Sequence, residues 1–321
     1  MSIHVVLGGA GVVGRETTAA LREAGHSVRS VTRSTSPGVA GVTGVEHVVA
    51  DLCDAASTAR AVQGADVAYL TVGLPYTTQA WRRDWPVVVR NTIEACLANG
   101  TRLVHFDNVY AYGRTDGPMT ESTPIRPASR KGAVRAELLA MLAAARDERG
   151  LDVTIARSAD FYGPGASTSV FNTFAIDAVS ASKPPTWLFD ATQPHSMTYT
   201  RDIGAALAVL GTDDRARGRT WHVPTAPALT GEQYLALATG DTGLAHRTMS
   251  ATIMRIGALF SSAARESLEM SYQYTAPYHF DSSAFERTFG LTPTPYAEGI
   301  AASLELSRSA RTSDQLAASS G

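Results

Sequence analysis

The chain has 321 residues, of which 44% are hydrophobic and 18% are charged, so it has the composition of an ordinary globular protein with a sizeable core. Its 28 basic and 30 acidic residues give a formal net charge of -2, and no basic stripe with interleaved aromatic residues occurs, so we expect no nucleic-acid partner. The two cysteines, Cys53 and Cys96, stand far apart without CxxC or histidine-rich surroundings, which predicts neither a disulfide framework nor a metal site.

The N-terminal segment lacks the features of a targeting signal. It has no basic region at its start, and glycines interrupt its apolar run after Leu7. No later segment approaches the unbroken apolar length that spans a bilayer. We therefore expect a cytoplasmic protein with no membrane partner.

Short runs rich in β-branched residues alternate with longer amphipathic stretches through the first half of the chain. The runs are Ile3–Leu7, Ser27–Thr32, Val45–Ala50, Val67–Val72, Leu103–Asp107 and Val153–Ala156. Between the last two runs, Val134, Leu138 and Leu142 recur at helical spacing and predict one long helix. Such alternation is typical of βαβ units and predicts an α/β fold, a Rossmann-type doubly wound parallel sheet.

The second half of the chain is less regular. From Tyr162 onward it is rich in Gly, Pro, Ser and Thr, and helix signals return at Asp202–Leu210 and Gly231–Thr239. We predict a Rossmann domain over residues 1–160, rejoined by about 197–223, with an interleaved substrate-binding lid from residues 161–196 and 224–308. Residues 309–321 are polar and small, and are predicted to form a flexible tail.

Gly8, Gly11 and Gly14 follow the first predicted strand with G-x-x-G-x-x-G spacing and open the first predicted helix. In this position Gly8 permits a tight turn, Gly11 lets the backbone approach a pyrophosphate, and Gly14 lets the helix pack closely on the strand. A glycine-rich turn alone is weak evidence, but this strand–turn–helix context predicts dinucleotide binding, with Val12 and Val13 completing the turn.

Arg33 follows the second predicted strand, where NAD-binding proteins usually carry a carboxylate for the ribose 2′-OH. No Asp or Glu occurs between Glu23 and Glu46. Arg33, together with Ser34, can bind a 2′-phosphate through charge-assisted hydrogen bonds; a solvated surface arginine is the alternative. We therefore predict NADP(H) as the cofactor.

Two further segments are expected to contact this cofactor. Asp51 and Leu52 follow the third strand and are expected to meet the adenine. Thr71, Val72 and Gly73 follow the fourth strand and are expected beneath the nicotinamide ribose. Both segments would lie at the carboxyl edge of the sheet, where ligands of open α/β sheets bind.

Six segments, spread from the N-terminus to residue 293, share the motifs of one family. They are Gly8–Gly14, Asp51–Leu52, Leu103–Gly113, Ile155–Gly165, Tyr199–Gly204 and Phe289–Pro293. Together they resemble the extended short-chain dehydrogenase/reductases, the NAD-dependent epimerase/dehydratase family, over nearly the whole chain. The resemblance implies a Rossmann fold and an enzyme that uses a nicotinamide dinucleotide.

The chain departs from this family at the residues that do the chemistry. The family uses a Ser or Thr and a Tyr-x-x-x-Lys pair, in which the lysine lowers the tyrosine pKa for proton exchange with the substrate. Here Asn108 stands at the serine position. In one register of the long helix Ser129 and Ala133 replace the pair, and in the other Pro127 and Lys131 do. The resemblance therefore implies an atypical member without the usual tyrosine.

Three residues are candidate catalytic substitutes. Tyr110 lies at the end of the strand that normally carries the catalytic hydroxyl, Asn108 can hydrogen-bond the same substrate atom, and Lys131 lies on the inward side of the helix. The alternatives are packing for the tyrosine and a solvated first-turn position for the lysine. The residues expected to contact substrate, for which lid packing is the alternative, are Tyr76, Trp81, Tyr162 and His195.

The leading functional hypothesis is an NADP(H)-dependent oxidoreductase that acts on a small, rather apolar C=O, C=N or C=C substrate without the Tyr-Lys pair. The alternatives are a nucleotide-sugar epimerase or dehydratase and a regulatory protein that senses NADP(H) without catalysis. The epimerase or dehydratase ranks lower because it needs the missing tyrosine base and because no dense arginine set marks a diphosphate subsite. A small molecule is the expected partner, and a homodimer is left open.

Overall fold

The computed structural model describes residues 2–34 and 44–319. A seven-stranded sheet forms its centre, in the order β11-β6-β5-β4-β1-β2-β3, and every neighbouring pair is parallel. The strands are β1 (Ile3–Leu7), β2 (Ser27–Thr32), β3 (Val45–Val49), β4 (Val67–Leu70), β5 (Arg102–Asn108), β6 (Val153–Ser158) and β11 (Thr220–His222). The chain winds outward in both directions from β1 and β4, which confirms the predicted Rossmann-type α/β fold.

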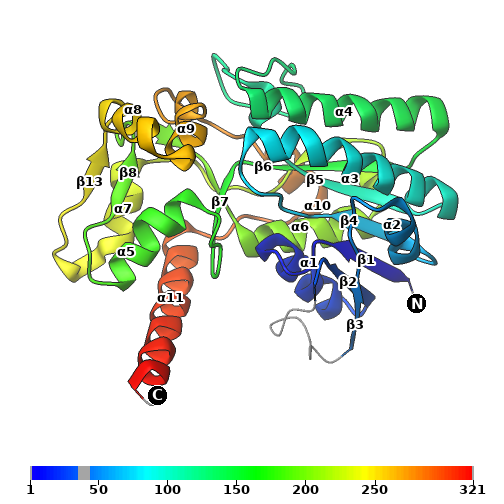
Figure 1. Ribbon diagram of the computed structural model, residues 1–321, viewed down its shortest axis with the longest axis horizontal. Coiled ribbons are helices and arrows are strands. Elements are labelled where there is room, and N and C mark those ends of the chain that lie inside the picture. Colours follow the sequence, from blue (N-terminus) through cyan, green and yellow to red (C-terminus); the bar gives the residue numbers. More distant parts are fainter. Residues whose placement is uncertain (1, 35–43, 320–321) are drawn as a thin grey trace.

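Helices cover both faces of this sheet (Figure 1). They are α1 (Val12–Glu23) and α6 (Thr200–Thr212) on one face, and α2 (Ala55–Val62), α3 (Thr78–Asn99) and α4 (Arg130–Arg149) on the other. Successive strand residues point to opposite faces, so Val5 belongs to the same core cluster as Leu138 of α4, while Val6 belongs to the cluster that contains Leu207 of α6. Both faces are buried, as expected for a parallel sheet.

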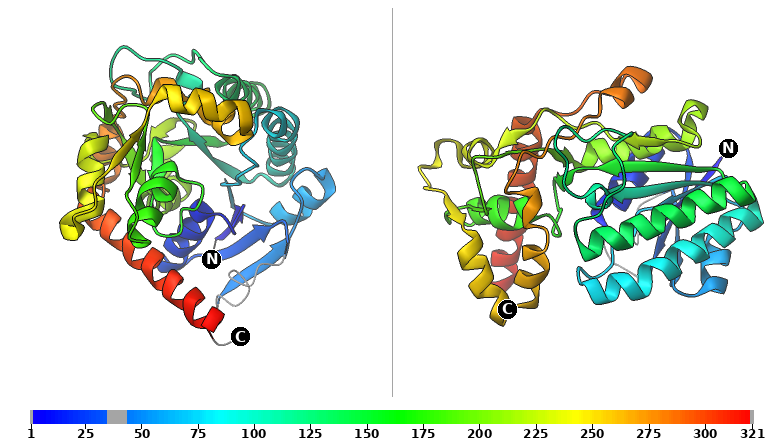
Figure 2. Two further views of the ribbon diagram at one scale, coloured as in Figure 1. Left: turned by 60° about the vertical axis from the view of Figure 1, so that its left-hand side comes forward. Right: turned by 90° about the horizontal axis from the view of Figure 1, so that it is seen from above.

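The smaller part of the molecule lies on the side toward which the central strands run, and Figures 1 and 2 show its elements gathered there. Its strand pairs are β7 (Asp160–Tyr162) with β10 (Met197–Tyr199), β8 (Thr186–Leu188) with β13 (Arg247–Met249), and β9 (Pro194–His195) with β12 (Leu229–Thr230). Its helices are α5 (Asp177–Ser180), α7 (Gly231–Thr239), α8 (Ala251–Phe260), α9 (Ser262–Leu268) and α11 (Tyr296–Ser319). An aromatic core that includes Phe171, Trp187, Tyr234 and Tyr296 holds these elements together. We call this part the lid.

The chain passes between the lid and the sheet more than once. β7 and β10 pair with each other and not with the large sheet, whereas α6 packs on α1 and β11 extends the sheet beside β6. After the lid strands, α10 (Ser283–Phe289) packs Phe285 against Trp221 of β11. The lid therefore stands directly over the carboxyl edge of the sheet.

Helix α11 continues through residues 309–319, for which the sequence predicts a flexible tail. The residues at 308–313 are exposed, so burial does not hold this part of the helix. The segment is rich in alanine and also contains arginine, leucine and glutamine, which favour helix without a buried face. None of the helices within the described ranges is long and apolar enough to cross a membrane.

Candidate active site

The glycine turn between β1 and α1 leaves room for a ligand at one position. Gly8 has φ +102°, and a Cβ there would stand 2.6 Å from the Val72 Cα. A Cβ on Gly14 would stand 2.3 Å from the Gly8 carbonyl oxygen, so the turn itself requires both glycines. A Cβ on Gly11 would meet nothing among the described residues closer than 3.4 Å. Gly11 is exposed and provides no side-chain cap for α1. The first N–H groups of α1 can therefore bind an anion such as pyrophosphate.

Arg15 connects this turn to the lid. Its Nη1 donates to the Ala10 carbonyl at 2.8 Å, and its Nη2 lies 3.5 Å from the Gly165 carbonyl in the turn after β7. Arg15 was not among the residues predicted from the sequence, although its place one residue after Gly14 was a usable signal. The guanidinium adds positive charge beside the anion-binding turn.

The residues predicted to bind the adenosine half lie at the carboxyl ends of β2 and β3. Arg33 and Ser34 are exposed just after β2. Asp51 is exposed after β3, where its Oδ1 accepts a hydrogen bond from the Cys53 N–H at 2.9 Å, and Leu52 is buried. The two strands are neighbours in the sheet, so these side chains share one edge.

The residues predicted to lie beneath the nicotinamide ribose follow β4. Thr71 is buried, and its Oγ1 donates to the Leu7 carbonyl at 3.1 Å. Val72 is half-buried with its backbone against Gly8, and Gly73 is exposed. The end of β4 therefore borders the glycine turn directly.

The end of β5 carries a small aromatic cluster. The Tyr110 hydroxyl lies 3.2 Å from the Tyr76 hydroxyl, and the Tyr110 ring stacks with Trp81 at 6.1 Å. Burial raises the pKa of Tyr110 well above its usual value, and the neighbouring Tyr76 adds to this effect. The Asn108 Oδ1 accepts a hydrogen bond from the Tyr110 N–H at 3.0 Å. Tyr110 can therefore donate a hydrogen bond, but it is a poor base at neutral pH.

Lys131 lies inward at the start of α4, with its side chain fully buried. Its Nζ bonds Glu266 Oε2 and lies 3.2 Å from Glu269 Oε2, and it stands 4.6 Å from the centre of the Tyr76 ring. Burial alone would raise the pKa of Glu266, but hydrogen bonds from Lys131 and Thr78 hold it below its usual value. Two lid carboxylates thus neutralise the lysine charge.

Asp107, near the end of β5, belongs to a buried ion network. Arg157 donates to Asp107 Oδ2 through Nε at 3.1 Å and Nη2 at 3.0 Å, and Arg135 Nη1 lies 3.7 Å from Oδ1. Arg135 is also stacked over Trp85, 4.2 Å from the ring centre. This network joins β5, β6 and α4 and has a structural role beneath the site.

The first residue of β7, Asp160, forms the centre of a second polar cluster. Its Oδ2 accepts a hydrogen bond from the Tyr274 hydroxyl at 2.9 Å and lies 3.1 Å from His195 Nε2. Burial raises the pKa of Tyr272 and Tyr278, and the Asp160 charge adds to the effect on both. Asp160 was not among the site residues predicted from the sequence, although its place just after the sixth strand was a signal for the carboxyl edge.

Three of the four residues predicted to contact substrate are buried, namely Trp81, Tyr162 and His195, whereas Tyr76 is exposed. His195 is 2% exposed, next to Asp160. Tyr162 is fully buried, and its ring packs against Phe171, Tyr199 and Tyr296 in the lid core. Tyr162 therefore packs the lid and presents no surface to a ligand in this conformation.

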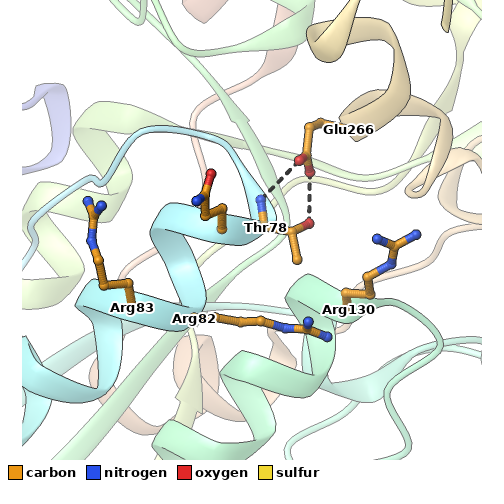
Figure 3. A pocket seen from close by; sticks show the side chains of 6 residues that line it. Thr78, Arg82, Arg83, Arg130 and Glu266 are labelled. Atoms are coloured by element: carbon orange, nitrogen blue, oxygen red, sulfur yellow. Dashed lines mark hydrogen bonds between the residues drawn. The ribbon is translucent and has the colours of Figure 1, made fainter. Parts of the chain in front are cut away.

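Three arginines from α3 and α4 line a cavity of about 560 Å³ beside the lid (Figure 3). Arg82 and Arg83 come from α3, and Arg130 comes from the start of α4. Glu266 closes the lid side, where its carboxylate accepts hydrogen bonds from the N–H and hydroxyl of Thr78. The sequence analysis found no dense arginine set because Arg130 stands far from the other two along the chain. The Arg83 guanidinium is already paired with Asp84, so Arg82 and Arg130 supply the positive charge that faces an anionic ligand here.

The model of one protein family, described as NAD dependent epimerase/dehydratase family, matches residues 4–223. The chain belongs to this family. The match begins in β1 and ends just after β11, so it includes the whole parallel sheet. No curated protein sequence matches the chain.

Solved structures of nucleotide-sugar enzymes share the fold. A dTDP-glucose 4,6-dehydratase double mutant from Streptomyces venezuelae, with NAD bound, matches with a TM-score of 0.79 at 20% identity, covering 96% of this chain and 97% of that chain. A UDP-glucuronic acid 4-epimerase from Bacillus cereus, in complex with UDP-glucuronic acid and NAD, has a TM-score of 0.78 at 18% identity and covers 96% and 99%. A UDP-N-acetylglucosamine 4-epimerase from Bacillus cereus has a TM-score of 0.75 at 15% identity and covers 96% of both chains.

These matches correct the functional expectation from the sequence. The leading hypothesis, an oxidoreductase for a small, rather apolar C=O, C=N or C=C substrate, is wrong, because the similar structures are nucleotide-sugar epimerases and dehydratases. That hypothesis was preferred over the epimerase or dehydratase because the chain lacks the tyrosine base. The sequence alone could not show how the lid compares with those of nucleotide-sugar enzymes. The findings favour the alternative that the sequence analysis ranked lower.

Proposed function

We propose that the protein is a nicotinamide-dinucleotide-dependent epimerase or dehydratase that acts on the sugar of a nucleoside diphosphate sugar. The observation that carries this proposal is the family match over residues 4–223, which includes a glycine turn with Gly11 open to a ligand. The fold similarity supports it, because the match to nucleotide-sugar enzymes covers 96% of this chain and therefore includes the lid.

The cofactor would bind across the carboxyl edge of the sheet. The turn Gly8–Gly14 and the first N–H groups of α1 would hold its pyrophosphate, with Arg15 adding positive charge. Asp51 and Leu52 would border the adenine, and Thr71–Gly73 would border the nicotinamide ribose. When bound, the cofactor supplies a hydride acceptor for a sugar carbinol and returns the hydride later in the cycle.

Arg33 supports a preference for NADP(H) within this proposal. It is exposed at the carboxyl end of β2, and Ser34 beside it is exposed as well. The sequence carries no acid from residue 24 to residue 45 that would favour a free ribose 2′-OH. A guanidinium suits a phosphate dianion because it can donate two parallel hydrogen bonds.

The end of β5 would orient the sugar. Tyr110 would donate a hydrogen bond to a sugar oxygen, and the Tyr76 hydroxyl would hydrogen-bond the Tyr110 hydroxyl. Asn108 would stabilise the turn that carries Tyr110 by accepting from its N–H. Lys131 would fasten α4 to the lid and would not lower the Tyr110 pKa, because Glu266 and Glu269 take up its charge. Proton transfer to and from the sugar hydroxyl then needs another residue.

Substrate conversion tests the proposal. The purified protein, loaded with NAD⁺ or NADP⁺, is incubated with dTDP-glucose, UDP-glucose, UDP-N-acetylglucosamine and UDP-glucuronic acid, and products are followed by NMR. We expect at least one sugar to be epimerised or dehydrated with catalytic amounts of cofactor. A protein that binds cofactor but neither converts nor binds any of these sugars would contradict the proposal and would favour the regulatory alternative.

A further inference from the structure

A carboxylate and an imidazole form a pair at the border between sheet and lid. Asp160 stands two residues beyond Ser158, which pairs in register with Asn108, and Tyr110 stands two residues beyond Asn108. Asp160 and Tyr110 therefore occupy equivalent positions, each two residues beyond the end of one of two adjacent strands. His195 reaches Asp160 from β9, with its Nε2 at 3.1 Å from Oδ2.

The hydrogen-bond partners of His195 favour one proton count for the pair over another. Its Nδ1 lies 3.2 Å from the Gln273 carbonyl oxygen, which can only accept, so Nδ1 carries a proton. Its Nε2 faces the carboxylate of Asp160. Without a further proton, a lone pair on His195 Nε2 would face a lone pair on Asp160 Oδ2 across 3.1 Å. This geometry favours a pair with one proton more than a neutral imidazole and a free carboxylate would hold.

The surroundings favour keeping that proton on the imidazole. The rings of Tyr274 and Tyr278 stack on His195 with centroid distances of 4.6 and 4.3 Å, and aromatic faces attract a cation. The Tyr274 hydroxyl donates to the same Asp160 oxygen, which stabilises the ionised carboxylate. The Tyr234 hydroxyl donates to the His195 carbonyl at 2.8 Å and fixes the backbone.

The two members of the pair differ in access to the site. The His195 side chain is 2% exposed, whereas the Asp160 side chain is 23% exposed. The Asp160 charge is also one of the causes that raise the pKa of Tyr110 and Tyr76, after burial, so it lies within electrostatic reach of the β5 end. Asp160 can therefore meet a ligand while His195 stays behind it.

We propose that Asp160 is the catalytic proton acceptor and donor of this site and that His195 is its positioning residue, held as an imidazolium. The role rests on the proposed function, which supplies the oxidised nicotinamide cofactor as hydride acceptor. In the oxidation step, Asp160 takes the proton of the sugar hydroxyl as its O–H bond breaks. The carbinol C–H bond breaks with its electron pair leaving as hydride to the cofactor, and the C=O bond forms. Reduction reverses each transfer, with the proton returning from Asp160. The imidazolium of His195 stabilises the ionised state of Asp160 before the oxidation step and again after the reduction step.

The protonation of His195 is tested first, and that test needs no substrate. The protein is labelled with ¹⁵N-histidine, and the His195 signals are assigned by their loss in His195→Gln. At pH 7 we expect both ring nitrogens of His195 to be protonated in the wild-type protein, and one in Asp160→Asn. A single protonated nitrogen in the wild type would overturn the proposal.

The role of Asp160 is tested by turnover of the sugar that the wild type converts. Asp160→Ala should lower kcat by roughly 10²–10⁴-fold without changing cofactor affinity, and added formate should restore part of the rate. Asp190→Asn is the matched control in the lid, since Asp190 bonds only its own turn at Thr192 and Gln193 in the described structure. Turnover within about threefold of wild type in Asp160→Ala would overturn the assignment. If the wild type neither converts nor binds any of the nucleotide sugars, the proposed function fails, and the NMR result still decides whether the pair holds the extra proton.

Discussion

Lys131 Nζ, at the start of α4, lies 3.2 Å from Glu269 Oε2 of the lid. Glu266 bonds the same ammonium group and also accepts from the N–H and hydroxyl of Thr78 at the start of α3. The lysine side chain is fully buried, while the two carboxylates are 18% and 17% exposed. These contacts fasten the lid to both helices that begin beside the site.

Removing both lid carboxylates should destabilise the protein strongly. Glu266→Gln with Glu269→Gln should lower the free energy of unfolding by about 3–5 kcal/mol, because the Lys131 ammonium is left buried without a counter-charge. Adding Lys131→Met should recover much of this loss, because an apolar side chain needs no partner. Urea unfolding of the three proteins measures the effect, and an equal loss in the double and triple variants would contradict it. Glu94→Gln, which removes an exposed pair with Arg149, is the control and should change stability by less than about 1 kcal/mol.

Two glycines of the turn between β1 and α1 should respond differently to alanine. Gly14→Ala should lower the free energy of unfolding by about 1–3 kcal/mol, because its Cβ would collide with the Gly8 carbonyl. Gly11→Ala should change stability by less than about 1 kcal/mol, because its Cβ has room. Gly11→Ala should nevertheless weaken cofactor binding by about tenfold or more, roughly 1.4 kcal/mol, by blocking the approach of the pyrophosphate. Thermal unfolding without cofactor and fluorescence titration with it measure the two effects, and unchanged affinity in Gly11→Ala would refute the assigned role.

The sheet and the glycine turn between β1 and α1 could be predicted from sequence because their signals are local. The strand runs alternate with helices at regular spacing, and Gly8, Gly11 and Gly14 stand within one turn, so neighbouring residues carry the information. The expected lysine on the inward side of α4 also depended only on helical spacing. No distant contact was needed for any of these inferences.

The polar partners in the site could not be predicted in the same way. Lys131 meets Glu266 and Glu269 from a distant part of the chain, and Asp160 meets His195 through strands of three and two residues. Such short strands have too few residues to show a periodicity. These pairings therefore depend on how the lid packs against the sheet, which the sequence pattern does not specify.

The cofactor preference should depend on Arg33. We expect NADPH to bind at least several-fold more tightly than NADH, and Arg33→Asp should reverse the preference by about 1.5–3 kcal/mol through loss of a charge-assisted contact and added repulsion. Titration of both proteins with both cofactors measures the change. Arg22→Asp, at the far end of α1, is a control with the same charge change and should leave the preference intact. Equal NADH and NADPH affinities in the wild type would argue against the role of Arg33.

Tyr110 should act as a hydrogen-bond donor and not as the catalytic base. Burial raises its pKa well above the usual value, so the phenol stays protonated throughout neutral and mildly alkaline pH. Its nearest hydroxyl is that of Tyr76, and the lysine that could lower its pKa is paired with lid carboxylates. Deprotonation of Tyr110 should therefore not appear as a limb of the pH–rate profile between pH 6 and about 10.

Tyr110→Phe tests this assignment. Losing one hydrogen bond to the substrate should lower kcat by about tenfold or less, since such a bond contributes about 0.5–1.5 kcal/mol. Loss of a proton-transfer group would instead lower kcat by roughly 10²–10⁴-fold. Tyr76→Phe is the matched control, because it removes the partner hydroxyl and leaves the Tyr110 phenol in place. A loss of more than about a hundredfold in Tyr110→Phe alone, together with a changed alkaline limb, would make Tyr110 the proton-transfer residue in place of Asp160.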